Sequence, residues 1–272
     1  MVNNSQNAAG SPIGVFDSGV GGLSVLQAIS TELPREQLIY FADTAYAPYG
    51  DRSDGEIIDR SCRVTAWLVQ LGCKAVVVAC NTATAAAIKT LRERFDIAII
   101  GIEPGLKPAV QRSKSGRVGV LATSYTVQSD KFNRLVETFA ADVQLFIQAC
   151  PGLVEILEQP GEHAERLHGL LTRYLKPMRE QGIDTLVLGC THYSFLRQAI
   201  QHYLGESVEI LDTPKAVASE VRRQLELRTL LTAQGETSPP HRYLTTGSDI
   251  PAIRAVMQSL IGETIQIEQI KE

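Results

Sequence analysis

Short apolar runs that stop abruptly at small polar residues recur along the chain, and a segment with helical periodicity follows most of them. The clearest run covers residues 75–79 and stops at Cys80, and a second one covers residues 185–189 and stops at Cys190. Such runs are typical of parallel β-strands that are buried on both faces. In α/β proteins the carboxyl ends of parallel strands carry the binding and catalytic groups. The pattern therefore predicts an α/β fold with a cysteine at the end of each of two strands.

The order of these runs indicates an internal repeat. A run that ends at Asp17 precedes the first cysteine run, and a similar run at 117–122 precedes the second one at nearly the same spacing. The repeat predicts two similar α/β lobes, each a mainly parallel sheet flanked by helices, with the active site in the cleft between them. We expect residues 12–104 plus 213–272 to form a discontinuous first lobe and residues 105–212 to form the second. Residues 1–11 are polar and are expected to be a disordered tail.

Composition and charge exclude several classes of function. The 272 residues carry a formal net charge of −4 and no basic stripe, which argues against a nucleic-acid partner. No apolar run reaches the roughly 18–20 residues that a membrane span needs, and the polar N-terminus lacks the features of a signal peptide. The five cysteines are odd in number and form no CxxC pair, so we expect free thiols, no metal and a cytoplasmic protein. The expected partner is a small-molecule substrate.

Two thiols at strand ends indicate a specific kind of chemistry. A cysteine between a strand and a helix N-terminus lies in partial positive potential, which stabilises its thiolate. A lone cysteine there is more often structural, but a matched pair across one crevice favours catalysis. One thiolate can remove a proton from a carbon acid while the other thiol returns a proton to the opposite face. Asp17 can assist Cys80, or simply cap the following helix, and His192 can form a Cys–His pair with Cys190, or be a structural histidine.

Four motifs of this chain resemble those of the glutamate racemases, within the aspartate/glutamate racemase family. The resemblance extends from about Pro12 to Leu211, and a weaker match covers residues 243–247. The motifs are Gly14-Val-Phe-Asp17-Ser18-Gly-Val-Gly21-Gly22-Leu-Ser-Val25, Asp43 with Pro48-Tyr49-Gly50, Ala79-Cys80-Asn81-Thr82-Ala-Thr84, and Gly189-Cys190-Thr191-His192-Tyr193.

The resemblance implies a cofactor-independent 1,1-proton transfer that converts L-glutamate to D-glutamate for peptidoglycan synthesis. Cys80 would face the α-proton of the D-substrate and Cys190 that of the L-substrate, with Asp17 and His192 assisting their respective thiols. Homo-oligomers are common in the family. The implied substrate-binding residues are Asp17, Ser18, Tyr49, Gly50, Asn81, Thr82, Thr191 and His192.

The resemblance also implies one further acidic residue. The family has a catalytic carboxylate after a Cys-Pro motif, and counting from Cys150-Pro151 places it at Glu158. Glu155 stands where the family usually has proline. Glu155 and Glu158 lie at i, i+3 spacing, which otherwise indicates a solvent-exposed helix face.

Other functions are compatible with parts of this pattern. A racemase for another substrate, such as aspartate or a hydantoin, would have the same pair of thiols. A non-catalytic ligand-binding relative would keep the fold but would not need Cys80 and Cys190. A thiol-redox enzyme would need their Cα atoms within about 7 Å of each other.

Overall fold

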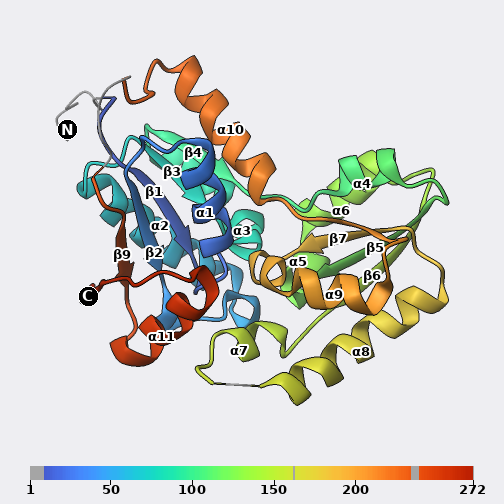
Figure 1. The fold of residues 1–272 in the computed structure, drawn as a ribbon. Coiled ribbons are helices and arrows are strands. Elements are labelled where there is room, and N and C mark those ends of the chain that lie inside the picture. Colours follow the sequence, from blue (N-terminus) through green and yellow to red (C-terminus); the bar gives the residue numbers. More distant parts are fainter. Residues whose placement is uncertain (1–8, 162, 234–238, 272) are drawn as a thin grey trace.

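The structure, a computed structural model, describes residues 9–161, 163–233 and 239–271 and contains two β-sheets flanked by helices (Figure 1). The first sheet has six strands in the order β10-β9-β2-β1-β3-β4, and the second has four in the order β6-β5-β7-β8. All strand pairs of the described residues are parallel. The predicted α/β fold with two mainly parallel sheets is confirmed.

The strands of the first sheet come from two separate stretches of the chain, and those of the second sheet come from the stretch between them. The first sheet contains β1 (Ile13–Asp17), β2 (Leu38–Ala42), β3 (Ala75–Val78), β4 (Ala98–Gly101), β9 (Arg242–Thr245) and β10 (Ile267–Gln269). The second sheet contains β5 (Arg117–Ala122), β6 (Gln144–Ala149), β7 (Thr185–Gly189) and β8 (Glu209–Leu211).

The helices cover both faces of each sheet. Those that pack mainly on the first sheet are α1 (Leu23–Glu32), α2 (Asp54–Gln70), α3 (Asn81–Arg94), α10 (Pro214–Leu227) and α11 (Ile250–Ile261). Those in the stretch that carries the second sheet are α4 (Leu106–Arg112), α5 (Ser124–Gln128), α6 (Asp130–Phe139), α7 (Leu153–Leu157), α8 (Ala164–Glu180) and α9 (Arg197–Leu204). None of the helices within the described ranges is long and apolar enough to cross a membrane.

Burial on both faces explains why the strands read as continuous apolar runs. Along β3, Val77 packs into the core under α1 and α10, whereas Val76 and Val78 pack on the opposite side under α2 and α3. The second sheet is built in the same way, with Val187 and Leu188 of β7 on opposite faces. A strand in this position has no solvent-facing side, so hydrophobic residues are favoured at every position.

Parallel pairing brings the polar strand ends of the first sheet to one edge. In the central strand β1, Phe16 is in register with Val78 of β3, so Asp17 and the residues after β3 lie at the same level. The Ala79 N–H donates to the Phe16 carbonyl at 2.8 Å, and the Asp43 N–H donates to the Asp17 carbonyl at 3.0 Å. The pairing therefore places Asp17 beside the Cys80 strand end.

The structure also contains elements that the apolar pattern does not reveal. β10 is only three residues long, and two of them are exposed polar residues, so it carries no apolar run. The segment after Cys190 begins as a 3₁₀ helix, Thr191–Leu196, before it becomes the α-helix α9. Of the predicted disordered tail, residues 1–8 lie outside the described residues, and the carbonyl of Ala9 accepts a hydrogen bond from Thr232 Oγ1 at 3.1 Å.

The N-terminus of α2 has a complete capping box. The Ser53 hydroxyl accepts from the Glu56 N–H at 3.4 Å, and the Glu56 carboxylate accepts from the Ser53 N–H at 3.0 Å. We expect Ser53→Ala to lower the free energy of unfolding by about 0.5–2 kcal/mol, because it leaves a helix N–H without its partner. Denaturant titration measures the change. Ser207→Ala, at an exposed serine outside any helix or strand, is the matched control and should change stability by less than about 0.5 kcal/mol.

Candidate active site

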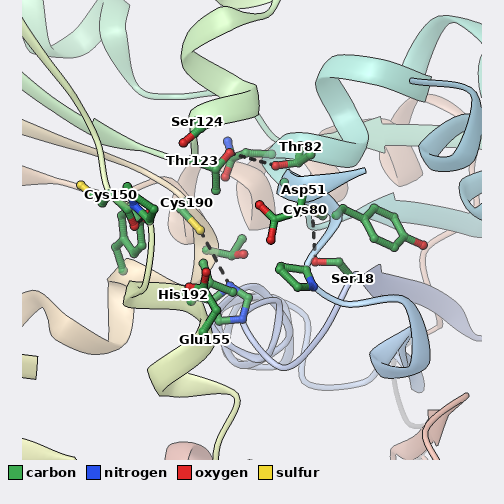
Figure 2. Close-up of a pocket in the computed structure, with 18 of the residues that line it drawn as sticks. Ser18, Asp51, Cys80, Thr82, Thr123, Ser124, Cys150, Glu155, Cys190 and His192 are labelled. Atoms are coloured by element: carbon green, nitrogen blue, oxygen red, sulfur yellow. Dashed lines mark hydrogen bonds between the residues drawn. The ribbon is translucent and has the colours of Figure 1, made fainter. Parts of the chain in front are cut away.

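A small cavity of about 50 Å³ lies between the carboxyl ends of the two sheets. Cys80 and Cys190 are each 6% exposed and both line it. Figure 2 shows Cys190 and His192 on one side of the cavity and Cys80 and Ser18 on the other. The lining residues are Asp17, Ser18, Pro48, Tyr49, Gly50, Asp51, Cys80, Asn81, Thr82, Thr123, Ser124, Cys150, Pro151, Val154, Glu155, Cys190, Thr191, His192 and Tyr193.

Cys80 is the N-cap residue of α3. Its Sγ accepts a hydrogen bond from the Ala83 N–H at 3.4 Å, and its S–H can donate to Ser18 Oγ at 3.7 Å. Burial, followed by the nearby Asp17 charge, raises the pKa of the Cys80 thiol. The helix N–H opposes this shift because it stabilises the thiolate. Cys80 is therefore a thiol at neutral pH, and the helix N–H stabilises the thiolate that forms when its proton is removed.

Asp17 is fully buried and accepts hydrogen bonds from the loop that follows it and from Thr191. Its Oδ1 accepts from the Ser18 N–H at 2.7 Å, and its Oδ2 accepts from the Gly22 N–H and, at 3.2 Å, from Thr191 Oγ1. Burial raises the pKa of Asp17, and the nearby His192 charge acts in the opposite direction. The bond to Gly22 caps the start of α1, so the capping role and a position beside Cys80 coexist.

Cys190, His192 and Glu158 form a hydrogen-bonded chain. Cys190 Sγ lies 3.8 Å from His192 Nδ1, and His192 Nε2 lies 2.6 Å from Glu158 Oε1. Burial lowers the pKa of His192, but the hydrogen bonds to Cys190 and Glu158 outweigh it, so the net shift is upward. Because an ionised carboxylate only accepts, Nε2 carries a proton and Nδ1 is the atom that exchanges a proton with the thiol.

Glu158 does not lie on a solvent-exposed helix face, as the i, i+3 spacing alone would indicate. It is the C-cap residue of α7, and its side chain is 17% exposed. In addition to its contact with His192, it accepts a hydrogen bond from the Val20 N–H at 2.7 Å. Glu155 instead lines the cavity and makes no such bond to any described residue.

The Asn81 side chain is available to bind a ligand. It is 5% exposed and lines the cavity, yet neither its Oδ1 nor its Nδ2 has a hydrogen-bond partner among the described residues. Buried amide groups are nearly always hydrogen-bonded, so this pair of atoms marks a place for polar groups of a bound molecule. Thr82 follows it on α3 and makes a hydrogen bond of 3.1 Å to Thr123, which also lines the cavity (Figure 2).

Tyr49 and Gly50 reach the cavity from a loop that a buried ion pair supports. The Tyr49 hydroxyl donates to Asp43 Oδ2 at 2.5 Å, and Arg60 of α2 binds the same carboxylate through two nitrogens, at 2.8 and 3.0 Å. A two-pronged contact of this kind fixes orientation as well as charge. Asp43 therefore holds the loop without lining the cavity itself.

The structure brings all the expected site residues together. Among them, only Glu158 does not line the cavity, and it contacts His192, which does. The sequence reasoning missed Thr123 and Ser124, which follow β5 as polar residues after an apolar run, and also Asp51 and Cys150. The signal for Thr123 and Ser124 was the same strand-end pattern that identified Cys80 and Cys190. Within the described residues, no three His, Cys, Asp or Glu side chains are grouped so as to hold a metal ion.

Two parallel sheets with a buried thiol at facing strand ends define an α/β protein with a two-thiol site. The family model for Asp/Glu/Hydantoin racemases matches residues 13–221, and the chain belongs to this family. The resemblance inferred from the sequence motifs is confirmed.

Individual relatives agree with this assignment over nearly the whole chain. The glutamate racemase of Ralstonia pickettii is 47% identical over 262 residues, which cover 96% of this chain and 92% of that protein. The crystal structure of glutamate racemase isoform RacE1 from Bacillus anthracis superposes with a TM-score of 0.86 at 35% identity, covering 96% and 97% of the two chains. The Escherichia coli glutamate racemase in complex with L-glutamate and the activator UDP-MurNAc-ala gives a TM-score of 0.81 at 31% identity, covering 95% and 97%.

Proposed function

We propose that this protein interconverts L- and D-glutamate by a 1,1-proton transfer between two cysteines, without a cofactor. The observation that carries the proposal is the position of Cys80 and Cys190 on opposite sides of one small buried cavity. Each thiol has its own polar partners, Ser18 and Asp17 for Cys80, and the His192–Glu158 pair for Cys190. The substrate is proposed from relatives that are glutamate racemases, two of them 47% and 48% identical to this chain.

In the L-to-D direction, the Cys190 thiolate removes the α-proton from one face of L-glutamate. The electron pair of the broken C–H bond remains on the α-carbon and its carboxylate, and the Cys80 thiol then donates a proton to the opposite face. The reverse direction exchanges the roles of the two sulfurs. His192 takes up and returns the Cys190 proton, and Asp17 does the same beside Cys80. Each turnover leaves one thiolate and one thiol, so no net charge is gained or lost.

The site binds a dicarboxylate without lysine or arginine, since neither residue type lines the cavity within the part of the chain that the structure describes. The negative charge is instead met by hydroxyl and amide groups and by N–H groups at the start of α3. We assign substrate binding to Asp17, Ser18, Tyr49, Gly50, Asn81, Thr82, Thr191 and His192. Preorganised donors of this kind also stabilise the charge that develops on the substrate carboxylate when the α-proton leaves.

The wider role follows from the same proposal. D-glutamate is a building block of peptidoglycan, so we assign the protein to cell-wall synthesis in the cytoplasm, where its five free cysteines would remain reduced. Its partner is then the amino acid, with no nucleic acid, and self-association stays a prediction. We also propose the lobe boundaries 12–104 plus 213–272 and 105–212, which agree with the division of strands between the two sheets.

Incubation with L-glutamate in D2O tests the function directly. Proton NMR follows loss of the α-proton signal, and polarimetry follows formation of the D-isomer, both without added cofactor. The proposal requires that α-deuteration accompany inversion. An unchanged α-proton signal together with an unchanged optical rotation would overturn it. Turnover of L-aspartate instead of L-glutamate would make the protein an aspartate racemase.

The rate with D-glutamate should rise with pH. Because burial raises the pKa of Cys80, the thiol form dominates at neutral pH, and the thiolate fraction grows about tenfold per pH unit below that pKa. We expect log kcat/KM for D-glutamate to increase with a slope near one from about pH 6 to pH 8. A stopped assay over this range measures the slope, and a flat profile would contradict a protonated resting Cys80.

A further inference from the structure

The loop between β1 and α1 contacts the partners of both thiols. Asp17, the last residue of β1, lies beside Cys80 and accepts from the Gly22 N–H at the other end of the loop. Between them, the Val20 N–H donates to Glu158 Oε1 at 2.7 Å, and the same oxygen lies 2.6 Å from His192 Nε2. The anion that this glycine-rich loop binds is therefore a carboxylate of the protein itself, from the half that carries the second sheet.

Two glycines in this loop are required because other side chains lie against them, and not because of their backbone conformation. Neither Gly19 nor Gly21 has a positive φ angle, so a residue with a side chain could adopt the same backbone. A Cβ at Gly19, however, would overlap the Glu158 carboxylate, and a Cβ at Gly21 would overlap the His192 ring. The missing side chains leave the space in which Glu158 and His192 lie against the loop.

Tyr40 of β2 holds the loop from beneath. It is fully buried, and its hydroxyl donates to the Gly19 carbonyl at 2.7 Å. The Gly19 carbonyl and the Val20 N–H belong to the same peptide group, so this bond fixes the peptide whose N–H binds Glu158. Tyr40 does not line the cavity, so it cannot act on a substrate directly.

We propose that the Gly19–Val20–Gly21 segment is a positioning element for the distant thiol: it holds Glu158 against His192 and so assembles the Cys190 acid/base chain when the two halves of the molecule are docked. The inference rests on the proposed function. Gly19, Val20 and Tyr40 are positioning residues, because they act on Cys190 only through Glu158 and His192. The proton-transfer step at Cys190 thereby depends on the loop between β1 and α1, which belongs to the part of the chain that carries the first sheet.

Gly19→Ala tests this coupling with deuterated substrates. The clash involves the flexible end of Glu158, so the fold should persist while Glu158 is displaced, and we expect kcat to fall by about 10²-fold. Because Cys190 deprotonates the L-isomer, the deuterium isotope effect on kcat/KM should rise with α-deuterated L-glutamate and fall with α-deuterated D-glutamate. Ser18→Ala, which removes the partner of Cys80, should give the opposite asymmetry. Gly55→Ala, where a Cβ meets nothing within 4 Å, is the neutral control.

Two further variants separate positioning from general damage to the fold. Tyr40→Phe keeps the ring but removes the bond to Gly19, and it should lower kcat more than it changes KM. In both Gly19→Ala and Tyr40→Phe, the NMR signals of the His192 imidazole should move toward those of Glu158→Gln. Gly19→Ala should also cost less activity in the Glu158→Gln background than in the wild type, because both changes break one contact.

The outcomes distinguish this inference from the function on which it rests. An unmodified protein that fails to racemise glutamate would overturn the proposed function, whereas the His192 signals would still test the loop. Racemisation by the wild type, together with unchanged His192 signals and symmetric isotope effects in Gly19→Ala, would overturn the positioning role alone.

Discussion

Replacing either sulfur by oxygen, as Cys80→Ser or Cys190→Ser, is expected to lower kcat for glutamate racemisation by about 10³-fold or more. A serine hydroxyl is a far weaker acid than a thiol, so it can neither form the anion that removes the α-proton nor readily give a proton back. Loss of one acid/base group typically costs about 10²–10⁴-fold. Both directions need both sulfurs, so each variant should lose both directions of turnover. Polarimetry with L- and with D-glutamate measures the loss.

The two variants should differ in α-proton exchange. In Cys80→Ser, Cys190 can still remove the α-proton of L-glutamate and return deuterium to the same face, so L-glutamate should exchange in D2O without inversion. Cys190→Ser should show this behaviour with D-glutamate. Cys62→Ser is the matched control, since Cys62 is also buried but does not line the cavity, and it should retain near-wild-type turnover. Full activity in either active-site variant would exclude the two-thiol mechanism.

The part of the site that lies at strand ends could be predicted from the sequence. Parallel strands place their carboxyl ends at one edge, so apolar runs that stop at Asp17, Cys80 and Cys190 are sufficient to predict that these groups gather. The same rule applied to the run at 117–122 would have found Thr123 and Ser124, which also line the cavity. The sequence therefore contains the signal for Thr123 and Ser124 as it does for the two cysteines.

Contacts made by loops could not be predicted in this way. Glu158 follows β6 by a short helix, and its hydrogen bond to Val20 joins residues 138 positions apart, which no local periodicity encodes. Its assignment depended on resemblance to a family, and the spacing alone indicated a solvent-exposed face. The short edge strand β10 was missed for a similar reason, because its place in the sheet depends on pairing with β9 and not on an apolar run of its own.

Glu158 and Glu155 offer a matched pair of carboxylates, three residues apart, with different expected roles. Glu158→Gln should lower kcat by about 10²–10³-fold. The neutral amide no longer stabilises a protonated His192, and it can present its NH2 group instead of an acceptor to Nε2 or to the Val20 N–H. Because the hydrogen bond and the charge of Glu158 both raise the pKa of His192, that pKa should also fall in the variant.

Glu155→Gln should change kcat less than about threefold, although Glu155 lines the cavity and Glu158 does not. Glu155 is half-buried and has no hydrogen-bond partner among the described residues, so it holds no catalytic group in place. Its loss should appear mainly in KM, through weaker repulsion of the substrate carboxylates. Steady-state kinetics with both enantiomers separates the two effects. If Glu155→Gln instead abolished turnover while Glu158→Gln did not, the Cys190 chain would have to run through Glu155. The position at which the family usually has proline would then carry the catalytic carboxylate of this protein.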